Sequence, residues 1–343
     1  MRPKFEFDFI IVGAGAAGCV LAARLTEDPS VRVLLIETGD WDRGLLLRMP
    51  VAFQKAVYGL RWDWGMKSEP EPQLGGRQLN LLSARVIGGS SSINGMLYMR
   101  GNPHDYDEWR ARGCEGWGHA DLLPYFKRAE TSWRGASPSH GDAGPINVER
   151  AQPTDLDNDY AAAAQRLGFP VAHDLNIAEF EGVGPAELSI QRNGRRSSAA
   201  LTYLYPALAR PGLQLERRAT VTRVILEGQV ARGVEYLQDG TPRQARATRE
   251  VVICAGGYQS PKLLMLSGIG PAAKLTSLGI KPAVDLPGVG KRLVNHAMLL
   301  LRFSTLAPMA FQSGLRFDRA AWNALRWTIA GTGPFSSLPC AGR

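Results

Sequence analysis

The clearest chemical pattern in the sequence is a glycine-rich hexapeptide followed by one acidic residue: Gly13, Ala14, Gly15, Ala16, Ala17, Gly18 and Glu37. The hexapeptide has the G-x-G-x-x-G form that binds the diphosphate of a dinucleotide when it joins a strand to a helix. In that role Gly13 permits a tight turn, Gly15 lets the backbone approach the diphosphate, and Gly18 allows close helix–strand packing. Glu37 lies 19 residues beyond Gly18, near the spacing of about 20 at which an acid accepts hydrogen bonds from ribose hydroxyls.

The segments around the hexapeptide have the order that this chemistry requires. Residues 7–12 are a short apolar run typical of a strand buried on both faces, residues 16–25 predict a helix, and residues 31–36 predict a second strand ending at Glu37. Such a unit attracts phosphates because free N–H groups and the positive end of the dipole meet at a helix N-terminus. A glycine turn without any ligand is the alternative, and the motif alone does not distinguish NAD from FAD.

Residues 83–101 form a second segment with polar and glycine-rich character. Gly88 and Gly89 precede three serines, and Asn94 adds a side-chain amide. Backbone N–H groups and hydroxyls of this kind suit contacts with phosphates and with a flavin ring. The alternative is a solvated Gly/Ser linker, but the apolar residues at 86–87 and 96–98 favour burial of the segment.

The sequence of residues 83–101 resembles the first signature of the glucose–methanol–choline (GMC) flavoproteins, and residues 256–270 resemble the second. The similarity extends from residue 7 to residue 298 and looks most like the choline and alcohol dehydrogenase branch. It implies an α/β fold (α+β overall): a Rossmann-like FAD-binding domain with a central parallel sheet and a small antiparallel meander, plus an incomplete substrate domain.

The same resemblance predicts how the chain is divided. Residues 5–298 correspond to the N-terminal FAD-binding region of the family, and residues 299–343 to the beginning of an incomplete substrate domain. Within the first region the expected nucleotide core is 5–40, 83–101 and 205–295, whereas 41–82 and 102–204 supply cover and substrate-side elements.

Local patterns predict further elements. Short helices are expected at 105–112, 120–129 and 160–167, and an antiparallel meander at 213–250. Residues 250–254 predict a separate apolar strand. A helix is then expected with Ser260 as its N-cap and Pro261 at its first position.

The resemblance also assigns a cofactor site. It implies that FAD is bound by Gly13, Ala14, Gly15, Ala16, Ala17, Gly18, Glu37, Val86, Gly89, Ser90, Asn94, Gly95, Met96, Leu97 and Val221. Val86 and residues 94–97 would line the diphosphate and the isoalloxazine, and Val221 would present its backbone to the adenine. Some relatives attach the flavin to a His directly before the Asn. This chain has Ile93 there, so we expect non-covalent FAD.

For the reaction, the resemblance implies an FAD-dependent oxidoreductase that acts on the CH–OH group of a primary alcohol, choline-like or aliphatic or aromatic, with hydride transfer to flavin N5. The catalytic His of the family lies in a C-terminal segment, and we expect that segment to be missing from a chain that ends at Arg343. No catalytic residue is assigned, because none of the five histidines lies in a matching motif: His104, His119, His140, His173 and His296. Three alternatives remain open: a non-catalytic FAD-binding fragment, a cyanohydrin lyase of the same family, and an NAD(P)-linked Rossmann reductase.

Composition excludes several classes of function. The net charge of +8 comes from scattered Lys and Arg residues, which argues against nucleic acid as a partner. Four cysteines lie far apart, without a C-x-x-C pair, so no metal site or disulfide framework is expected. We find no transmembrane segment and expect a cytoplasmic protein. The expected partners are a small alcohol and an electron acceptor of unknown identity.

Overall fold

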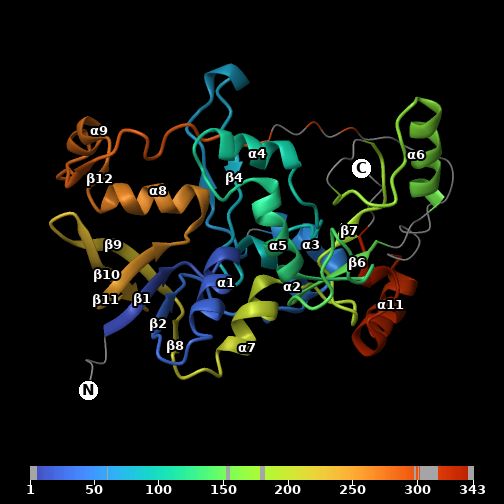
Figure 1. Ribbon diagram of the computed structural model, residues 1–343, viewed down its shortest axis with the longest axis horizontal. Coiled ribbons are helices and arrows are strands. Elements are labelled where there is room, and N and C mark those ends of the chain that lie inside the picture. Colours follow the sequence, from blue (N-terminus) through green and yellow to red (C-terminus); the bar gives the residue numbers. More distant parts are fainter. Residues whose placement is uncertain are drawn as a thin grey trace. The chain divides into compact units, whose positions relative to one another are not determined.

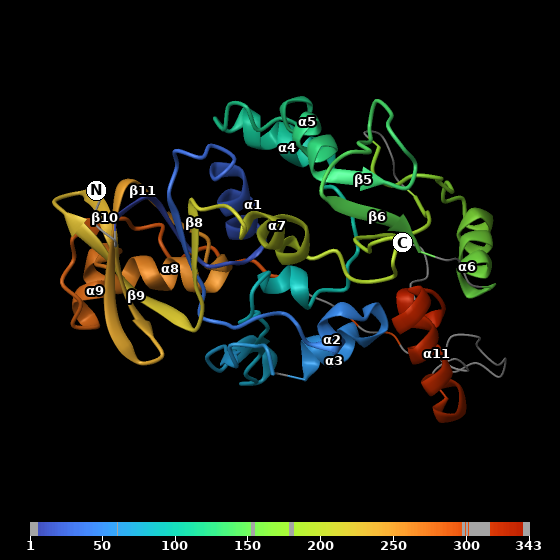
Figure 2. The same cartoon turned by 90° about the horizontal axis from the view of Figure 1, so that it is seen from below.

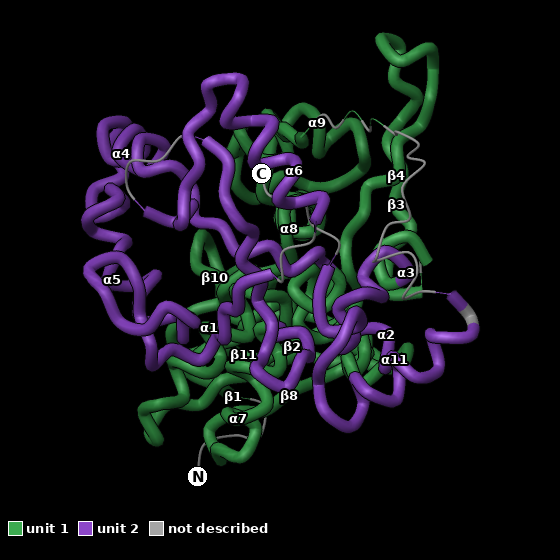
Figure 3. Tube along the Cα trace, turned by 90° about the vertical axis from the view of Figure 1, so that its right-hand side faces the viewer, with its two compact units in different colours: residues 1–44, 56–93, 199–303 green, residues 45–55, 94–198, 304–343 purple. Residues whose placement is uncertain are grey.

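The computed structural model describes residues 6–59, 61–151, 155–177, 182–296, 299, 301 and 316–338. The chain divides into two compact units, each built from three stretches: residues 1–44, 56–93 and 199–303 form unit 1, and residues 45–55, 94–198 and 304–343 form unit 2 (Figure 3). The predicted division at residue 298 into a cofactor region and a substrate domain concerns function and stays a prediction.

Unit 1 is organised around a six-stranded sheet with the order β8-β2-β1-β11-β10-β9. Its strands are β1 (Glu6–Val12), β2 (Val33–Ile36), β8 (Leu213–Glu216), β9 (Ala219–Glu227), β10 (Val230–Gln238) and β11 (Thr241–Ile253) (Figure 1). The neighbours β8, β2, β1 and β11 pair in parallel, and β11, β10 and β9 pair antiparallel. The predicted α/β class, with a parallel sheet and an antiparallel meander, is therefore confirmed.

Two predicted details of this sheet are wrong. The meander does not end before a separate strand at 250–254, because β11 is one continuous strand of 13 residues. Its first half pairs antiparallel with β10, and its second half pairs parallel with β1. In addition, β8 does not join the meander; Leu213 pairs with Val33 in the parallel part. Local alternation predicts a strand, but it does not specify the partner of that strand.

Helices cover both faces of the parallel strands (Figures 1 and 2). On one face, Ile10 and Val12 of β1 share a buried cluster with Leu263 of α8 (Gly256–Leu266). On the other, Ile11 lies beneath α1 (Ala16–Leu25), so that a Cβ on Gly18 would be 3.4 Å from its side chain. Alternate residues of one strand are thus buried on opposite sides, as expected for a parallel strand between two helix layers.

The start of α8 differs from the prediction. The helix begins at Gly256, with Ala255 as N-cap, and Pro261 lies inside it. Ser260 is therefore not a cap. Pro261 lacks an N–H and cannot bond to the carbonyl of Gly257, but this removes only one hydrogen bond close to the N-terminus. The helix starts with Gly256 and Gly257, which are not crowded: a Cβ on either would meet nothing within 4 Å. The Ser-Pro pattern in the sequence does not reveal this earlier start.

Smaller elements complete unit 1. They are β3 (Met66–Lys67), η2 (Pro72–Leu74), β4 (Asn80–Leu81), η3 (Gly89–Ser92), η4 (Ala200–Leu204), α7 (Tyr205–Ala207), β12 (Ile269–Gly270), α9 (Ala272–Ser277) and β13 (Val284–Asp285). Helix α3 (Phe53–Tyr58) contains the boundary between the units.

Unit 2 contains short helices and a three-stranded sheet with the order β5-β6-β7. Its elements are α2 (Leu45–Arg48), η1 (Pro50–Ala52), α4 (Pro103–Ala111), α5 (His119–Ala129), β5 (Glu130–Ser132), β6 (Ile146–Arg150), α6 (Asp155–Arg166), β7 (Glu187–Leu188), α11 (Phe317–Ala330) and η5 (Pro334–Ser336). The helices expected at 105–112, 120–129 and 160–167 correspond to α4, α5 and α6, with shifted ends. None of the helices in the described ranges is both long and apolar enough to cross a bilayer.

Candidate functional site

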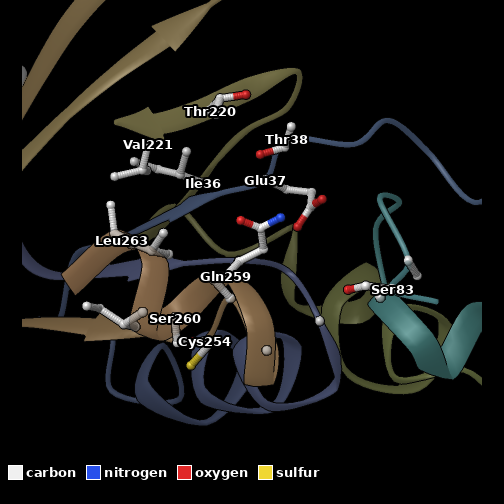
Figure 4. Close-up of a pocket in the computed structure, with 18 of the residues that line it drawn as sticks. Ile36, Glu37, Thr38, Ser83, Thr220, Val221, Cys254, Gln259, Ser260 and Leu263 are labelled. Atoms are coloured by element: carbon white, nitrogen blue, oxygen red, sulfur yellow. The ribbon is translucent and has the colours of Figure 1, made fainter. Parts of the chain in front are cut away.

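A pocket of about 750 Å³ lies in unit 1 at the carboxyl ends of β1, β2 and β11 (Figure 4). The pocket is lined by the last residue of each of these strands: Val12, Ile36 and Ile253. The carboxyl edge of a parallel sheet is where α/β folds bind ligands, and the volume is within the usual range for cofactor sites. The pocket therefore has the position and the size expected for a dinucleotide.

The glycine turn forms one wall of the pocket. Gly13 has a φ of +101°, and a Cβ there would lie 2.6 Å from the carbonyl oxygen of Cys254. A Cβ on Gly18 would overlap the carbonyl oxygen of Gly13. Both positions thus need glycine for the fold itself. Gly15 is different, because its Cβ would meet only the oxygen of Cys254, at 3.8 Å; the protein alone gives no steric reason for glycine there.

The second polar segment packs directly on this turn. The N–H of Gly88 donates to the carbonyl oxygen of Ala14 at 2.7 Å. Gly89 has a φ of +55°, and a Cβ on it would lie 2.7 Å from the Cα of Gly15. Gly89 and Ser90 both line the pocket. The contact therefore requires glycine at position 89, and Gly88 beside it also has a positive φ, +86°.

Glu37, directly after β2, lines the pocket beside the glycine turn. Its carboxylate is buried, with 8% of the residue exposed, and lines the pocket. Oε2 accepts from Ala14 N–H at 2.8 Å and Oε1 from Gly39 N–H at 2.7 Å. Burial raises the pKa of Glu37, and these two N–H groups oppose the shift. Each oxygen keeps a second lone pair, so the carboxylate can still accept hydrogen bonds from a ligand hydroxyl.

Two helix N-termini also face the pocket. Gly15, Ala16 and Ala17 at the start of α1 line it, as do Ala255 and Gly256 at the start of α8. Neither helix has a capping side chain or an acidic residue in its first turn. Their unpaired N–H groups and positive dipole ends favour an anion. The site thus combines donors suited to a diphosphate with a carboxylate suited to ribose hydroxyls.

The structure brings together part of the predicted site. Gly13, Gly15, Ala16, Ala17, Glu37, Gly89, Ser90 and Val221 line the pocket. Ala14, Gly18 and Val86 are buried behind it, where they hold Glu37, the helix and Gly89 in place. Asn94, Gly95, Met96 and Leu97 belong to unit 2, and their part in the site stays a prediction.

The sequence-based assignment missed several lining residues. The pocket also contains Thr38, Ser91, Thr220, Thr222, Cys254, Gly256, Gln259 and Lys262. Gln259 projects from α8 toward the same space as Glu37 (Figure 4). A signal for part of this set was present, since residues 254–257 follow a parallel strand just as the glycine turn follows β1, and the end of such a strand is a site of ligand binding.

The thiols in the described part of the chain form no separate site. Cys19, Cys114 and Cys254 are free thiols. Burial raises the pKa of Cys19 and of Cys254, so neither is activated as a thiolate. No group of three His, Cys, Asp or Glu side chains with metal-binding geometry occurs within the described residues.

The chain is similar to known proteins of one family. The sequence matches the family described as GMC oxidoreductase over residues 7–298. Oxygen-dependent choline dehydrogenase from Brucella canis is 44% identical over 329 residues, which cover 96% of this chain and 60% of that protein. Pyridoxine 4-oxidase from Mesorbium loti has a TM-score of 0.77 at 36% identity, covering 82% of this chain and 55% of its own.

A further solved structure, an FAD-dependent oxidoreductase from Chaetomium thermophilum, has a TM-score of 0.84 at 31% identity and covers 96% of this chain and 60% of its own. The present chain thus spans about 60% of the length of the curated relatives that it matches.

Proposed function

This chain belongs to the GMC oxidoreductase family, and on that premise we propose that it binds FAD in the pocket at the carboxyl edge of its parallel sheet and supports the oxidation of a primary alcohol. The proposal has three parts: the cofactor, the way in which it is held, and the reaction. The first two have support in the residues of the chain, and the third has support in its relatives.

The cofactor part depends on one observation: the Glu37 carboxylate and the glycine turn line one pocket and are joined by the hydrogen bond from Ala14 N–H to Glu37 Oε2. FAD needs a diphosphate site beside a ribose site, and these two groups provide them. Gly15 adds a test of fit. A Cβ there would meet only one atom, at the ordinary contact distance of 3.8 Å, so the protein does not need glycine there, whereas a backbone that must approach a diphosphate does.

We propose that FAD is held without a covalent bond. The position directly before Asn94 is Ile93, a buried hydrocarbon side chain that offers no nucleophile. Affinity then comes from the N–H groups at the starts of α1 and α8, from Glu37 and from the apolar walls formed by residues such as Val221 and Leu263. Acid precipitation should release the whole yellow colour into the supernatant.

For the reaction, we propose oxidation of the CH–OH group of a primary alcohol. Bound FAD would supply the hydride acceptor, N5 of its ring. The support comes from named relatives, which include a choline dehydrogenase and a pyridoxine 4-oxidase. A choline-like alcohol is the first candidate substrate. The residues of this chain bind and orient the cofactor, and we assign no proton-abstracting base among them.

The experiment is to purify the protein and titrate it with FAD, with NAD as the competing ligand. We expect one FAD per chain, with the visible absorption of a bound flavin and quenched fluorescence. Anaerobic mixing with choline, and separately with a short aliphatic and an aromatic alcohol, then tests the reaction by bleaching of the flavin band. Protein that binds NAD but no FAD would overturn the cofactor assignment; bound flavin that no alcohol bleaches would support an FAD-binding remnant, and cyanohydrin cleavage without bleaching would support a lyase.

A further inference from the structure

Gln259 is a polar side chain of α8 that lines the same pocket as Glu37. The two residues come from different elements of unit 1, because Glu37 directly follows β2. In Figure 4 the side-chain amide of Gln259 points toward the Glu37 carboxylate. Leu263, one turn further along α8, lines the pocket with a hydrocarbon side chain. Helix α8 thus offers a ligand both an apolar contact and a hydrogen-bonding group.

The protein itself uses only part of this amide. Nε2 of Gln259 donates to Sδ of Met66, in β3, at 3.3 Å. A thioether sulfur is a weak acceptor, and an amide nitrogen carries two N–H donors. Among the described residues, the Gln259 amide has no further hydrogen-bond partner, and no hydrogen bond joins it directly to Glu37. The amide therefore keeps an N–H donor for a ligand in the pocket.

Glu37 can serve only as the acceptor of such a pair. Its two oxygens already accept one hydrogen bond each from the protein, from Ala14 N–H and Gly39 N–H, and each keeps a further lone pair. An ionised carboxylate and an NH2 group that share one space are both satisfied by a hydroxyl. The O–H of that hydroxyl donates to the carboxylate, and its oxygen accepts from the N–H. Glu37 and Gln259 together thus favour a ligand hydroxyl over a group that only donates or only accepts.

We infer that Gln259 is a second protein ligand of the cofactor sugar: its Nε2 donates to the ribose hydroxyl, in the adenosine half, that donates to Glu37. The inference rests on the proposed function, which places the ribose of a dinucleotide at Glu37. Recognition of the sugar then depends on two elements, β2 and α8. A sugar that lacks this hydroxyl leaves a carboxylate lone pair and an N–H unpaired, which costs more than the loss of an ordinary contact.

The test compares FAD with two analogues whose adenosine half carries 2′-deoxyribose or 3′-deoxyribose, each titrated calorimetrically into the whole chain. Wild type should prefer FAD over one analogue by about tenfold or more, because two hydrogen bonds to one hydroxyl are lost. In Gln259→Leu this preference should fall by about fivefold, since only the bond to Glu37 remains. An unchanged preference over both analogues in Gln259→Leu would overturn the inference. Wild-type protein that binds no FAD would instead overturn the proposed function.

Three further variants separate a ligand contact from a structural one. Gln259→Glu keeps the size of the side chain but cannot donate when ionised, and its charge repels Glu37, so it should bind FAD more weakly than Gln259→Leu. Met66→Leu removes the other partner of Nε2 and should bind FAD nearly as wild type does. Gln73→Leu, at an exposed position, is the matched control.

Melting temperatures of all these variants show whether each one folds. A Gln259 that merely joined α8 to β3 would give Met66→Leu and Gln259→Leu the same loss of FAD affinity. That result, or wild-type affinity in Gln259→Glu, would overturn the assignment of Gln259 as a ligand of the sugar.

Discussion

The backbone N–H of Ala14 donates to the Glu37 carboxylate, with 2.8 Å between N and Oε2, although the two residues lie 23 positions apart. The other carboxylate oxygen accepts from Gly39 N–H at 2.7 Å. One buried acid therefore fixes both the glycine turn after β1 and the chain that leaves β2. The two walls of the proposed FAD site are tied together before any ligand binds, which reduces the ordering that binding requires.

Glu37→Gln is the most direct test of this link. A Gln side chain has one acceptor oxygen, so one of the two N–H groups would face an NH2 group instead. We expect a loss of about 1–3 kcal/mol in the free energy of unfolding and FAD binding weakened at least about tenfold. Urea unfolding and FAD titration measure the two effects. Glu250→Gln, at an exposed residue of β11, is the control and should change neither.

The pH dependence of stability follows from the burial of the same carboxyl group. Burial raises the pKa of Glu37 in the folded protein. In the folded protein Glu37 then keeps its proton to a higher pH than in the unfolded chain. The contribution of Glu37 to the free energy of unfolding is therefore fully present below the usual pKa of about 4.3, and it is lost as pH rises through the raised pKa. Unfolding measured for wild type and Glu37→Gln from about pH 4 to about pH 8 should show the wild type losing stability relative to the variant. A relative stability that increases with pH would contradict this.

Two glycines of one turn should separate ligand binding from folding. Gly18→Ala places a methyl group against the carbonyl oxygen of Gly13. We expect destabilisation of about 1–3 kcal/mol or more, even though Ala favours helices. Gly15→Ala meets only one atom, at 3.8 Å, so the melting temperature should stay near that of the wild type while FAD affinity falls about tenfold or more. Equal FAD affinity in Gly15→Ala and wild type would argue against a diphosphate at this position.

Gly89→Ala tests the packing of the second segment on the turn. It combines a left-handed φ of +55° with a Cβ 2.7 Å from the Cα of Gly15. Gly75 has a similar φ of +66° but nothing within 4 Å of its Cβ, so Gly75→Ala isolates the backbone cost, about 1 kcal/mol. We expect Gly89→Ala to lose clearly more stability and to bind FAD more weakly. The two variants are compared by denaturant unfolding; equal losses would mean that the contact with Gly15 is loose.

Unit 2 has a buried charge cluster whose loss should be costly. Glu130 is fully buried, accepts from Arg100 Nη2 at 2.8 Å and lies 2.9 Å from His140 Nδ1. Glu130→Ala removes the carboxylate that pairs with buried Arg100 and leaves His140 with Asp174 alone, and we expect a loss of about 3–5 kcal/mol. Glu108 pairs with Arg112 on an exposed helix surface, so Glu108→Ala should cost less than about 1 kcal/mol. Thermal unfolding of both variants measures the contrast, and similar losses would show that burial adds nothing.

Much of the proposed cofactor site could be predicted from the sequence because its signals are local. Gly13, Gly18 and Glu37 belong to one strand–helix–strand unit, where each residue type answers a steric or hydrogen-bonding need of its near neighbours. The same locality explains why the helix at 16–25 was predicted with its observed bounds. Local rules failed where two local signals competed: Ser260-Pro261 resembles a helix start, but α8 begins at Gly256.

Only the tertiary structure decided what depends on contacts between distant segments. It paired β8 with β2 and let β11 serve both halves of the sheet, because strand partners are chosen by packing over the whole unit. It placed Gln259 in the pocket with Glu37 and Arg196 against Asn94. A sequence shows which residues can donate, accept or turn. Which of them meet depends on the burial of the whole chain, since no residue type specifies a partner a hundred positions away.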